Sequence, residues 1–198
     1  MRSAEPLPLT TTDVAVLQSQ VAALTADVAA LKERLAAAEH RLPQNHFSLC
    51  LVSGDFERVT AGLMMANMAA SLEMEATIFF AFWGVQAVRK GRRFRGKTSM
   101  EKVLATMVKS DIGSLGSQRF NFAGVGPRIF TQLMKQKGIA TPGELLATAR
   151  ELGVQLQACT TSMEVFGLTV DELLPGVTCC GASQFVDVAS RSALSLVL

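Results

Sequence analysis

Two short β-rich runs separated by one helical segment constrain the fold of this chain most strongly. The first run is FSLCLVS at 47–53, and the second is ATIFFAF at 76–82. The apolar residues of segment 58–72, between them, have the spacing of a helix. A strand, a helix and a second strand within about 35 residues form a right-handed crossover, which makes the two strands parallel.

The same alternation continues in the C-terminal half. A capping box, Thr141-Pro142-Gly143-Glu144, predicts the start of a helix that runs to Gly153. After it the pattern predicts strands at 154–159, 177–181 and 194–198, with a helix at 183–191 before the last strand. The predicted fold class is α/β: a three-layer α/β/α sandwich with a mainly parallel five-stranded sheet, whose strand order stays open.

The N-terminal segment has a heptad pattern. Its apolar residues alternate in steps of three and four: Val14, Leu17, Val21, Leu24, Val28, Leu31, Leu35, Ala38 and Leu42. In a parallel pair, Asp27 would face Lys32 and Arg34 would face Glu39, so both flanking pairs have opposite charges. The pattern predicts a coiled-coil helix over 13–42 that contributes to a homo-oligomer through 14–42, together with the α/β domain. The alternative is an amphipathic helix folded onto its own domain.

The remaining boundaries follow from these elements. We expect a flexible N-terminus at 1–12, a linker at 43–46 and one α/β domain at 47–198. The domain carries a long insert at 88–138, in which Thr98-x-x-Glu101 predicts a helix through Val108. A connection of this length usually has a function or forms an interface, so we expect the insert to cover the strand ends or a neighbouring subunit.

Charge and composition exclude several classes of protein. The formal net charge is +2, and the basic run at 89–97 reads as a solvated loop with one interleaved aromatic residue, so we expect no nucleic-acid partner. The longest uncharged stretches fall short of the roughly 18–20 apolar residues that a membrane span needs, and the N-terminus lacks the apolar core of a signal peptide. Four scattered cysteines favour a reduced compartment. We therefore expect a cytoplasmic protein with no membrane partner.

Three predicted strands end in residues that could form a site. Ligands of parallel α/β sheets collect at the carboxyl ends of the strands. The residues there are Ser53, Gly54 and Asp55 after the first strand, Phe82, Trp83 and Gly84 after the second, and Cys159 at the end of the third. We predict that the first six line a pocket beside Cys159.

Cys159 is the candidate nucleophile. Thr161-x-x-Glu164 is a potential capping box, which predicts a short helix beginning two residues after Cys159. The dipole of such a helix would stabilise the thiolate and lower the pKa of the thiol. The alternative is an inert buried cysteine, since cysteine is among the most frequently buried residues.

The remaining cysteines and the histidines suggest no further cofactor. Cys179 and Cys180 are adjacent in a predicted strand, so their side chains should point to opposite faces, and one of them is a possible second thiol. We expect Cys50, in the middle of the first strand, to be a core residue. The two histidines, His40 and His46, lie on the coil and in the linker, so we expect no Cys-His dyad, no metal site and no cofactor.

Two separated blocks carry a family resemblance. Residues 51–84 contain a Phe-Trp-Gly stretch, and residues 151–185 contain the motif Ala-Cys-x-x-Ser-Met. These blocks resemble the DsrE/DsrF/DrsH-like family, in particular its larger DsrE-like branch, over residues 47–198. The resemblance implies an oligomeric α/β/α protein of sulfur relay in which Cys159 accepts and passes sulfane sulfur as a persulfide.

The resemblance therefore implies a sulfur carrier or sulfurtransferase that exchanges sulfur with donor and acceptor proteins. Backbone N–H groups after Cys159 and the hydroxyls of Thr160, Thr161 and Ser162 would hold the anionic sulfur. Two other functions stay open: a non-catalytic oligomeric scaffold in which Cys159 only packs, and a thiol redox protein using Cys179 and Cys180.

Overall fold

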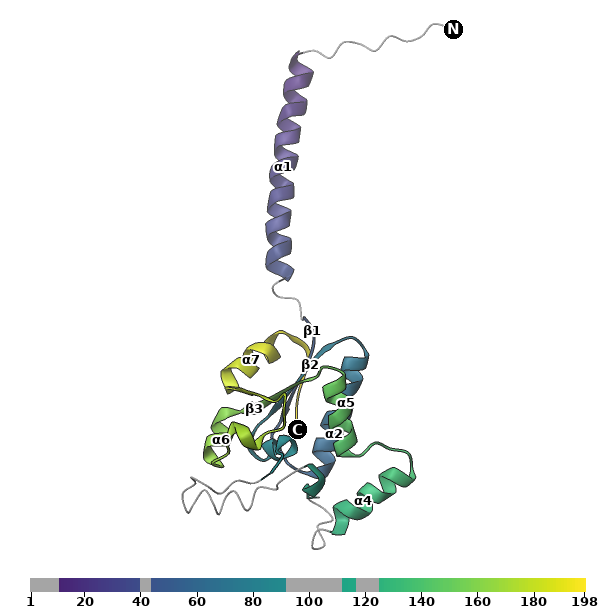
Figure 1. Cartoon of the computed structure of the whole chain (residues 1–198). Helices are drawn as coiled ribbons and strands as arrows, with labels where there is room; N and C mark the ends of the chain where they lie inside the picture. The colour runs from purple at the N-terminus through teal and green to yellow at the C-terminus, as the bar shows by residue number, and fades with distance from the viewer. Residues whose placement is uncertain (1–10, 40–43, 92–111, 117–124) are drawn as a thin grey trace, which may run out of the picture. The chain divides into compact units, whose positions relative to one another are not determined.

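The computed structural model describes residues 11–39, 44–91, 112–116 and 125–198 (Figure 1). The chain divides into two compact units, 1–42 and 43–198, which we treat separately. The helix predicted from Thr98 to Val108 and most of the basic run lie outside the described residues.

The second unit is built on a five-stranded sheet in which every pair of neighbouring strands is parallel. The strand order is β4-β3-β2-β1-β5. The strands are β1 (Gln44–Leu51), β2 (Glu75–Phe80), β3 (Gln155–Cys159), β4 (Thr178–Cys180) and β5 (Ser192–Val197). Strand β1 begins inside the segment predicted as a linker. The predicted number and direction of the strands are confirmed.

Helices cover both faces of this sheet, which confirms the three-layer α/β/α fold (Figure 1). Helices α2 (Phe56–Ser71) and α5 (Pro142–Glu151) pack together on one face, and α7 (Ala182–Arg191) lies on the other. The connection from β2 to β3 contains η1 (Phe82–Val88), η2 (Ile112–Ser114) and α4 (Val125–Gln136). The connection from β3 to β4 contains α6 (Thr160–Val165) and η3 (Val170–Glu172).

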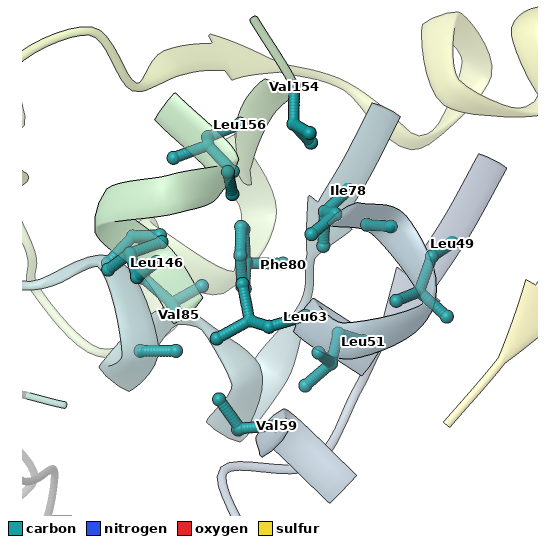
Figure 2. Close-up of a cluster of buried hydrophobic side chains, with 14 of the residues drawn as sticks. Leu49, Leu51, Val59, Leu63, Ile78, Phe80, Val85, Leu146, Val154 and Leu156 are labelled. Carbon is teal, nitrogen blue, oxygen red and sulfur yellow. The ribbon is translucent and has the colours of Figure 1, made fainter. Parts of the chain in front are cut away.

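The main hydrophobic core lies between the sheet and the pair α2–α5 (Figure 2). Because side chains alternate along a strand, every second residue enters this core. The strands contribute Leu49, Leu51, Ile78, Phe80 and Leu156, and the helices contribute Val59, Leu63 and Leu146. All of these side chains are at most 4% exposed, so this face supplies most of the apolar burial that stabilises the domain.

Helix α5 begins at the predicted capping box. The Glu144 backbone N–H donates to the Thr141 hydroxyl at 3.4 Å, and the Thr141 backbone N–H donates to the Glu144 carboxylate at 2.7 Å. This backbone hydrogen bond and a second one from the Thr141 hydroxyl lower the pKa of Glu144. The box orients the first turn of a helix that carries two core leucines.

One residue of the basic run is buried. Arg89 is 1% exposed and donates to the carboxylate of Glu172, also 1% exposed, at 2.6 Å. The Lys90 backbone N–H donates to the Glu172 carbonyl oxygen in the same contact. The expectation of a solvated loop is therefore wrong for Arg89, which joins the end of η1 to η3. Breaking such a buried pair typically costs about 3–5 kcal/mol.

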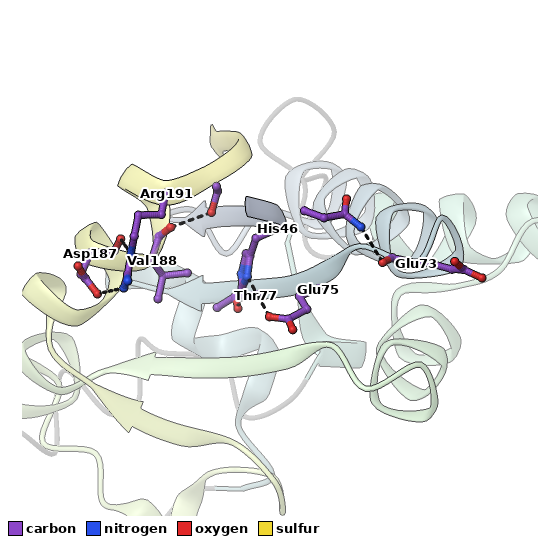
Figure 3. Close-up of polar contacts among 9 residues, drawn as sticks. His46, Glu73, Glu75, Thr77, Asp187, Val188 and Arg191 are labelled. Carbon is purple, nitrogen blue, oxygen red and sulfur yellow. Dashed lines mark hydrogen bonds and ion pairs between the residues drawn. The ribbon is translucent and has the colours of Figure 1, made fainter. Parts of the chain in front are cut away.

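The amino end of the sheet carries a polar cluster (Figure 3). His46 is buried on β1, and its Nε2 lies 2.9 Å from the Thr77 hydroxyl on β2. Its Nδ1 lies 3.5 Å from the carboxylate of Glu75. His46 is thus part of a strand rather than of a linker, and it lies at the opposite end of the sheet from Cys159.

The first unit contains one long helix, α1 (Thr11–Glu39). The apolar heptad side chains from Val14 to Leu35 are between 40% and 63% exposed in the single chain. By length and composition alone, Val14–Leu35 could also cross a membrane, a criterion that soluble core helices and signal sequences also meet. The helix itself is confirmed over most of its predicted range, and the coiled coil stays a prediction.

Two glycines allow the end of β1 to contact η1. The Gly84 backbone N–H donates to the carbonyl oxygen of Val52 at 3.1 Å. A Cβ at Gly84 would lie 2.0 Å from the carbonyl oxygen of Leu51, and a Cβ at Gly54 would lie 2.5 Å from that of Trp83. Both clashes involve backbone, which cannot move away as a flexible side chain can.

We expect Gly84→Ala to lower the free energy of unfolding by about 3 kcal/mol or more, because the methyl group forces β1 and η1 apart. Gly91→Ala is the matched control, since a Cβ there meets no atom within 4 Å. Urea unfolding of both variants measures the difference. Equal stabilities would show that the two segments do not pack this closely.

Candidate functional site

The parallel sheet brings the three predicted segments to one edge. Strands β1, β2 and β3 end side by side, so the residues that follow them share the carboxyl edge. The Phe82 backbone N–H donates to the Ser162 hydroxyl at 2.8 Å, which joins the end of β2 to α6. The close approach of Gly54 to Trp83 joins the ends of β1 and β2.

Phe82 adopts an unusual backbone conformation at this edge. Its φ is +44°, in the left-handed region that bulky side chains rarely occupy, and its side chain is 56% exposed. The hydrogen bond to Ser162 helps to hold this turn. The next ring, of Trp83, lies against Phe166 with centroids 4.9 Å apart. Strained residues of this kind cluster at functional sites, which makes Phe82 a notable member of the predicted pocket.

Ser53 and Asp55 form a local turn at the end of β1. The Ser53 hydroxyl donates to the carboxylate of Asp55, whose backbone N–H donates to Ser53 Oγ at 3.1 Å. Asp55 is also the N-cap residue of α2, without a side-chain capping bond. These hydrogen bonds fix the conformation of the turn between β1 and α2.

Cys159 ends β3 and is 6% exposed. It is also the N-cap residue of α6, which begins at Thr160, one residue earlier than predicted. The predicted capping box of Thr161 and Glu164 is therefore wrong, because β3 passes into the helix without an intervening loop. Ser162 is buried and Thr161 is exposed.

Three of the four cysteines share one face of the sheet. Cys50, Cys159 and Cys180 lie on the side covered by α7, in or against a small cluster that contains Phe79 and Phe185. The strand register pairs Cys159 with Cys180 directly. Sequence reasoning treated Cys50 as part of the core and missed this grouping, since it depends on the strand order and register.

Burial and mutual proximity affect two of these thiols. Burial, and secondarily the neighbouring Cys159, raises the pKa of Cys50. Burial also raises the pKa of Cys180, with smaller contributions from Cys159 and Cys179. Both thiols therefore retain their protons to higher pH than an exposed cysteine does.

Cys179 points to the opposite face, as its position in the strand predicted. Its side chain is exposed, and its Sγ lies 3.7 Å from the Sδ atom of Met163. Partial burial of its sulfur raises the pKa of this thiol as well. Cys180, in contrast, is 8% exposed, so the prediction that one of the two adjacent cysteines is buried is confirmed.

A surface cavity of about 470 Å³ lies elsewhere. Its lining residues are Ala147, Arg150, Glu151, Val154, Leu156 and Gly176. Leu156 and Val154 mark the amino end of β3, whereas Cys159 marks the carboxyl end. The thiols therefore do not line this cavity. Within the described part of the chain, no group of three or more His, Cys, Asp or Glu side chains is arranged to hold a metal ion.

Comparison with known proteins gives two relatives that align over most of their own length. The uncharacterized protein YrkE of Bacillus subtilis is 34% identical over 152 residues, which cover 76% of this chain and 95% of the relative. The sulfur carrier protein DsrE2 of Allochromatium vinosum is 25% identical over 161 residues, which cover 79% of this chain and all of the relative.

A family-level match covers the whole α/β unit. The family described as DsrE/DsrF/DrsH-like matches residues 43–197, which include every strand and both sequence blocks that carry the resemblance. Helix α1 lies outside this match. The chain belongs to the DsrE/DsrF/DrsH-like family.

Proposed function

We propose that this protein is a sulfur carrier or sulfurtransferase that holds sulfane sulfur as a persulfide on Cys159. The observation that carries the proposal is the position of this thiol, at the carboxyl end of β3 beside the strained Phe82 turn and next to Cys180. Family membership and the name of the relative from Allochromatium vinosum, a sulfur carrier protein, support the same chemistry.

The chemistry requires only thiol exchange. The Cys159 thiolate attacks the outer sulfur of a donor persulfide, and the donor leaves as a thiolate. An acceptor thiolate then attacks the outer sulfur on Cys159, which restores the Cys159 thiolate. The hydroxyls of Thr160, Thr161 and Ser162 follow Cys159 in sequence and are the candidates for holding the anionic sulfur.

Helix α7 lies on the same face of the sheet as Cys159, packs mainly against β1 and β5, and contributes Phe185 to the cluster that contains Cys159. Phe185 is the one buried residue of α7, so this helix packs lightly on the face of the sheet that carries Cys50, Cys159 and Cys180. The Phe185 ring stacks on Phe79 with centroids 4.7 Å apart and an interplanar angle of 10°. We propose that local opening of α7 exposes Cys159 to its donor and acceptor, since weakly packed segments open most readily.

The burial of Cys159 also favours a second candidate function. The thiol is only 6% exposed, which is also what a cysteine with no role beyond packing, in a non-catalytic scaffold, would show. The two functions differ in whether Cys159 reacts in the native protein. A redox role for Cys179 together with Cys180 is less compatible with the structure, because these side chains lie on opposite faces.

We further propose that the protein acts in the cytoplasm with protein donors and acceptors of sulfur, as a homo-oligomer. The exposed heptad side chains of α1 support self-association, since a coiled coil would bury them between chains. The proposal includes no nucleic-acid partner, membrane partner, metal or cofactor.

Sulfur loading should require Cys159. Immediately after loading with glutathione persulfide, before any sulfide is released, wild type and Cys179→Ser should have gained one sulfur atom per chain, and Cys159→Ser should not. Intact-mass analysis under non-reducing conditions measures the gain. Equal loading of Cys159→Ser and wild type would show that another residue carries the sulfur.

Phe185→Ala should make Cys159 react about tenfold faster with a thiol-labelling reagent in the native protein, because the stack that holds α7 is lost. Val186→Ala is the matched control, since Val186 is 61% exposed on the same helix. Peptide mapping of the labelled cysteine measures the rate, and circular dichroism checks folding. If the two variants label equally slowly, α7 does not control access.

Leu24→Glu combined with Leu31→Glu should dissociate the oligomer or lower its stability, because both leucines lie on the heptad seam. Ala23→Glu with Ala30→Glu adds the same charge away from the seam and should leave assembly unchanged. Sedimentation velocity measures the molecular mass. An unchanged mass in the leucine variant would assign α1 another role.

A further inference from the structure

The pairing of β3 with β4 places Cys159 and Cys180 side by side. They are partners in the register of these parallel strands, and both lie in the cluster that contains Phe79 and, from α7, Phe185. Neighbouring strands are about 4.8 Å apart. A disulfide requires Cα atoms about 4.4–6.8 Å apart, so this pair meets the backbone requirement for a direct bond.

The other two cysteines do not meet this requirement with Cys159. Cys50 lies on β1, two strands away, at a distance of about 10 Å by the usual spacing of strands. This exceeds the limit of about 7 Å for a disulfide. Cys179 points to the opposite face, where its sulfur contacts Met163.

The Cys180 thiol is held toward β3. Its Sγ–H donates to the Gln157 side-chain oxygen at 3.2 Å. Gln157 lies two residues before Cys159 on the same strand, so both side chains project from the same face of the sheet. Cys180 is thus oriented along the side of the sheet on which a sulfur atom bound to Cys159 would lie.

We propose that Cys180 is the resolving thiol of Cys159: it attacks the Cys159 persulfide and releases the carried sulfur as hydrogen sulfide. This step rests on the function proposed above. It adds a second outcome to sulfur carriage, because sulfur that meets no acceptor thiol leaves the protein as sulfide.

The step balances without an external oxidant. Cys180 Sγ attacks Cys159 Sγ, and a Cys159–Cys180 disulfide forms as the bond from Cys159 Sγ to the outer sulfur breaks. The outer sulfur leaves with the electron pair as hydrosulfide, and the proton of the Cys180 thiol balances it as hydrogen sulfide. In this step the outer sulfur is reduced to sulfide and the Cys180 sulfur is oxidised to the disulfide level, while the oxidation state of the Cys159 sulfur does not change. A dithiol reductant then restores both thiols.

The test uses the full chain, loaded with glutathione persulfide, separated from the donor and followed without added thiol. Wild type and the matched control Cys179→Ser should release about one sulfide per loaded sulfur, and peptide mapping should find the Cys159–Cys180 disulfide. Cys180→Ser should load normally and retain its sulfur at least about ten times longer. If Cys180→Ser does not fold, Cys180→Ala takes its place in the release measurement. The disulfide map of wild type then tests the Cys159–Cys180 bond without any variant.

Three results would overturn the inference while leaving sulfur carriage intact: equal release by Cys180→Ser, a persulfide on Cys180, or a disulfide of Cys159 with Cys50. Oxidation of the unloaded protein with diamide tests the pairing separately and should join Cys159 to Cys180. If diamide joins them but wild type never loads sulfur, the proposed function fails, and the resolving step fails with it.

Discussion

The parallel register of the sheet is the constraint on which the rest of this structure depends. It places the ends of β1, β2 and β3 at one edge, where the predicted pocket residues follow, and it pairs Cys159 with Cys180 across β3 and β4. A shift of one residue in either strand would turn its side chains to the other face. The thiol cluster would then be lost even though every strand remained.

The two faces of the sheet differ in how firmly they are covered. The face under α2 and α5 buries a large aliphatic and aromatic core, which supplies most of the hydrophobic stabilisation. On the face that carries Cys50, Cys159 and Cys180, α7 packs against β1 and β5, and its one buried residue is Phe185. Because most of the hydrophobic stabilisation lies on the face under α2 and α5, the opposite face can open locally while the domain stays folded. Such opening would give partners access to the thiols.

The loops at the carboxyl edge of the sheet, around Cys159, are held by short-range contacts of several kinds. Gly54 and Gly84 permit backbone segments to meet, the Ser162 hydroxyl holds the Phe82 turn, and the buried pair of Arg89 and Glu172 joins the segments that follow β2 and β3. These contacts restrict the backbone on either side of Cys159, whereas α7 contributes one buried side chain, Phe185, to the same face of the sheet.

The sequence by itself determined the alternation of strands and helices, the α5 capping box, the opposite orientations of Cys179 and Cys180, and the family, because these depend on local spacing and on short motifs. Tertiary structure alone decided the strand order, the partnership of Cys159 with Cys180, the direct start of α6 and the burial of Arg89. Each of these depends on contacts between residues distant in the chain, and hydrophobic periodicity carries no information about which strands become neighbours.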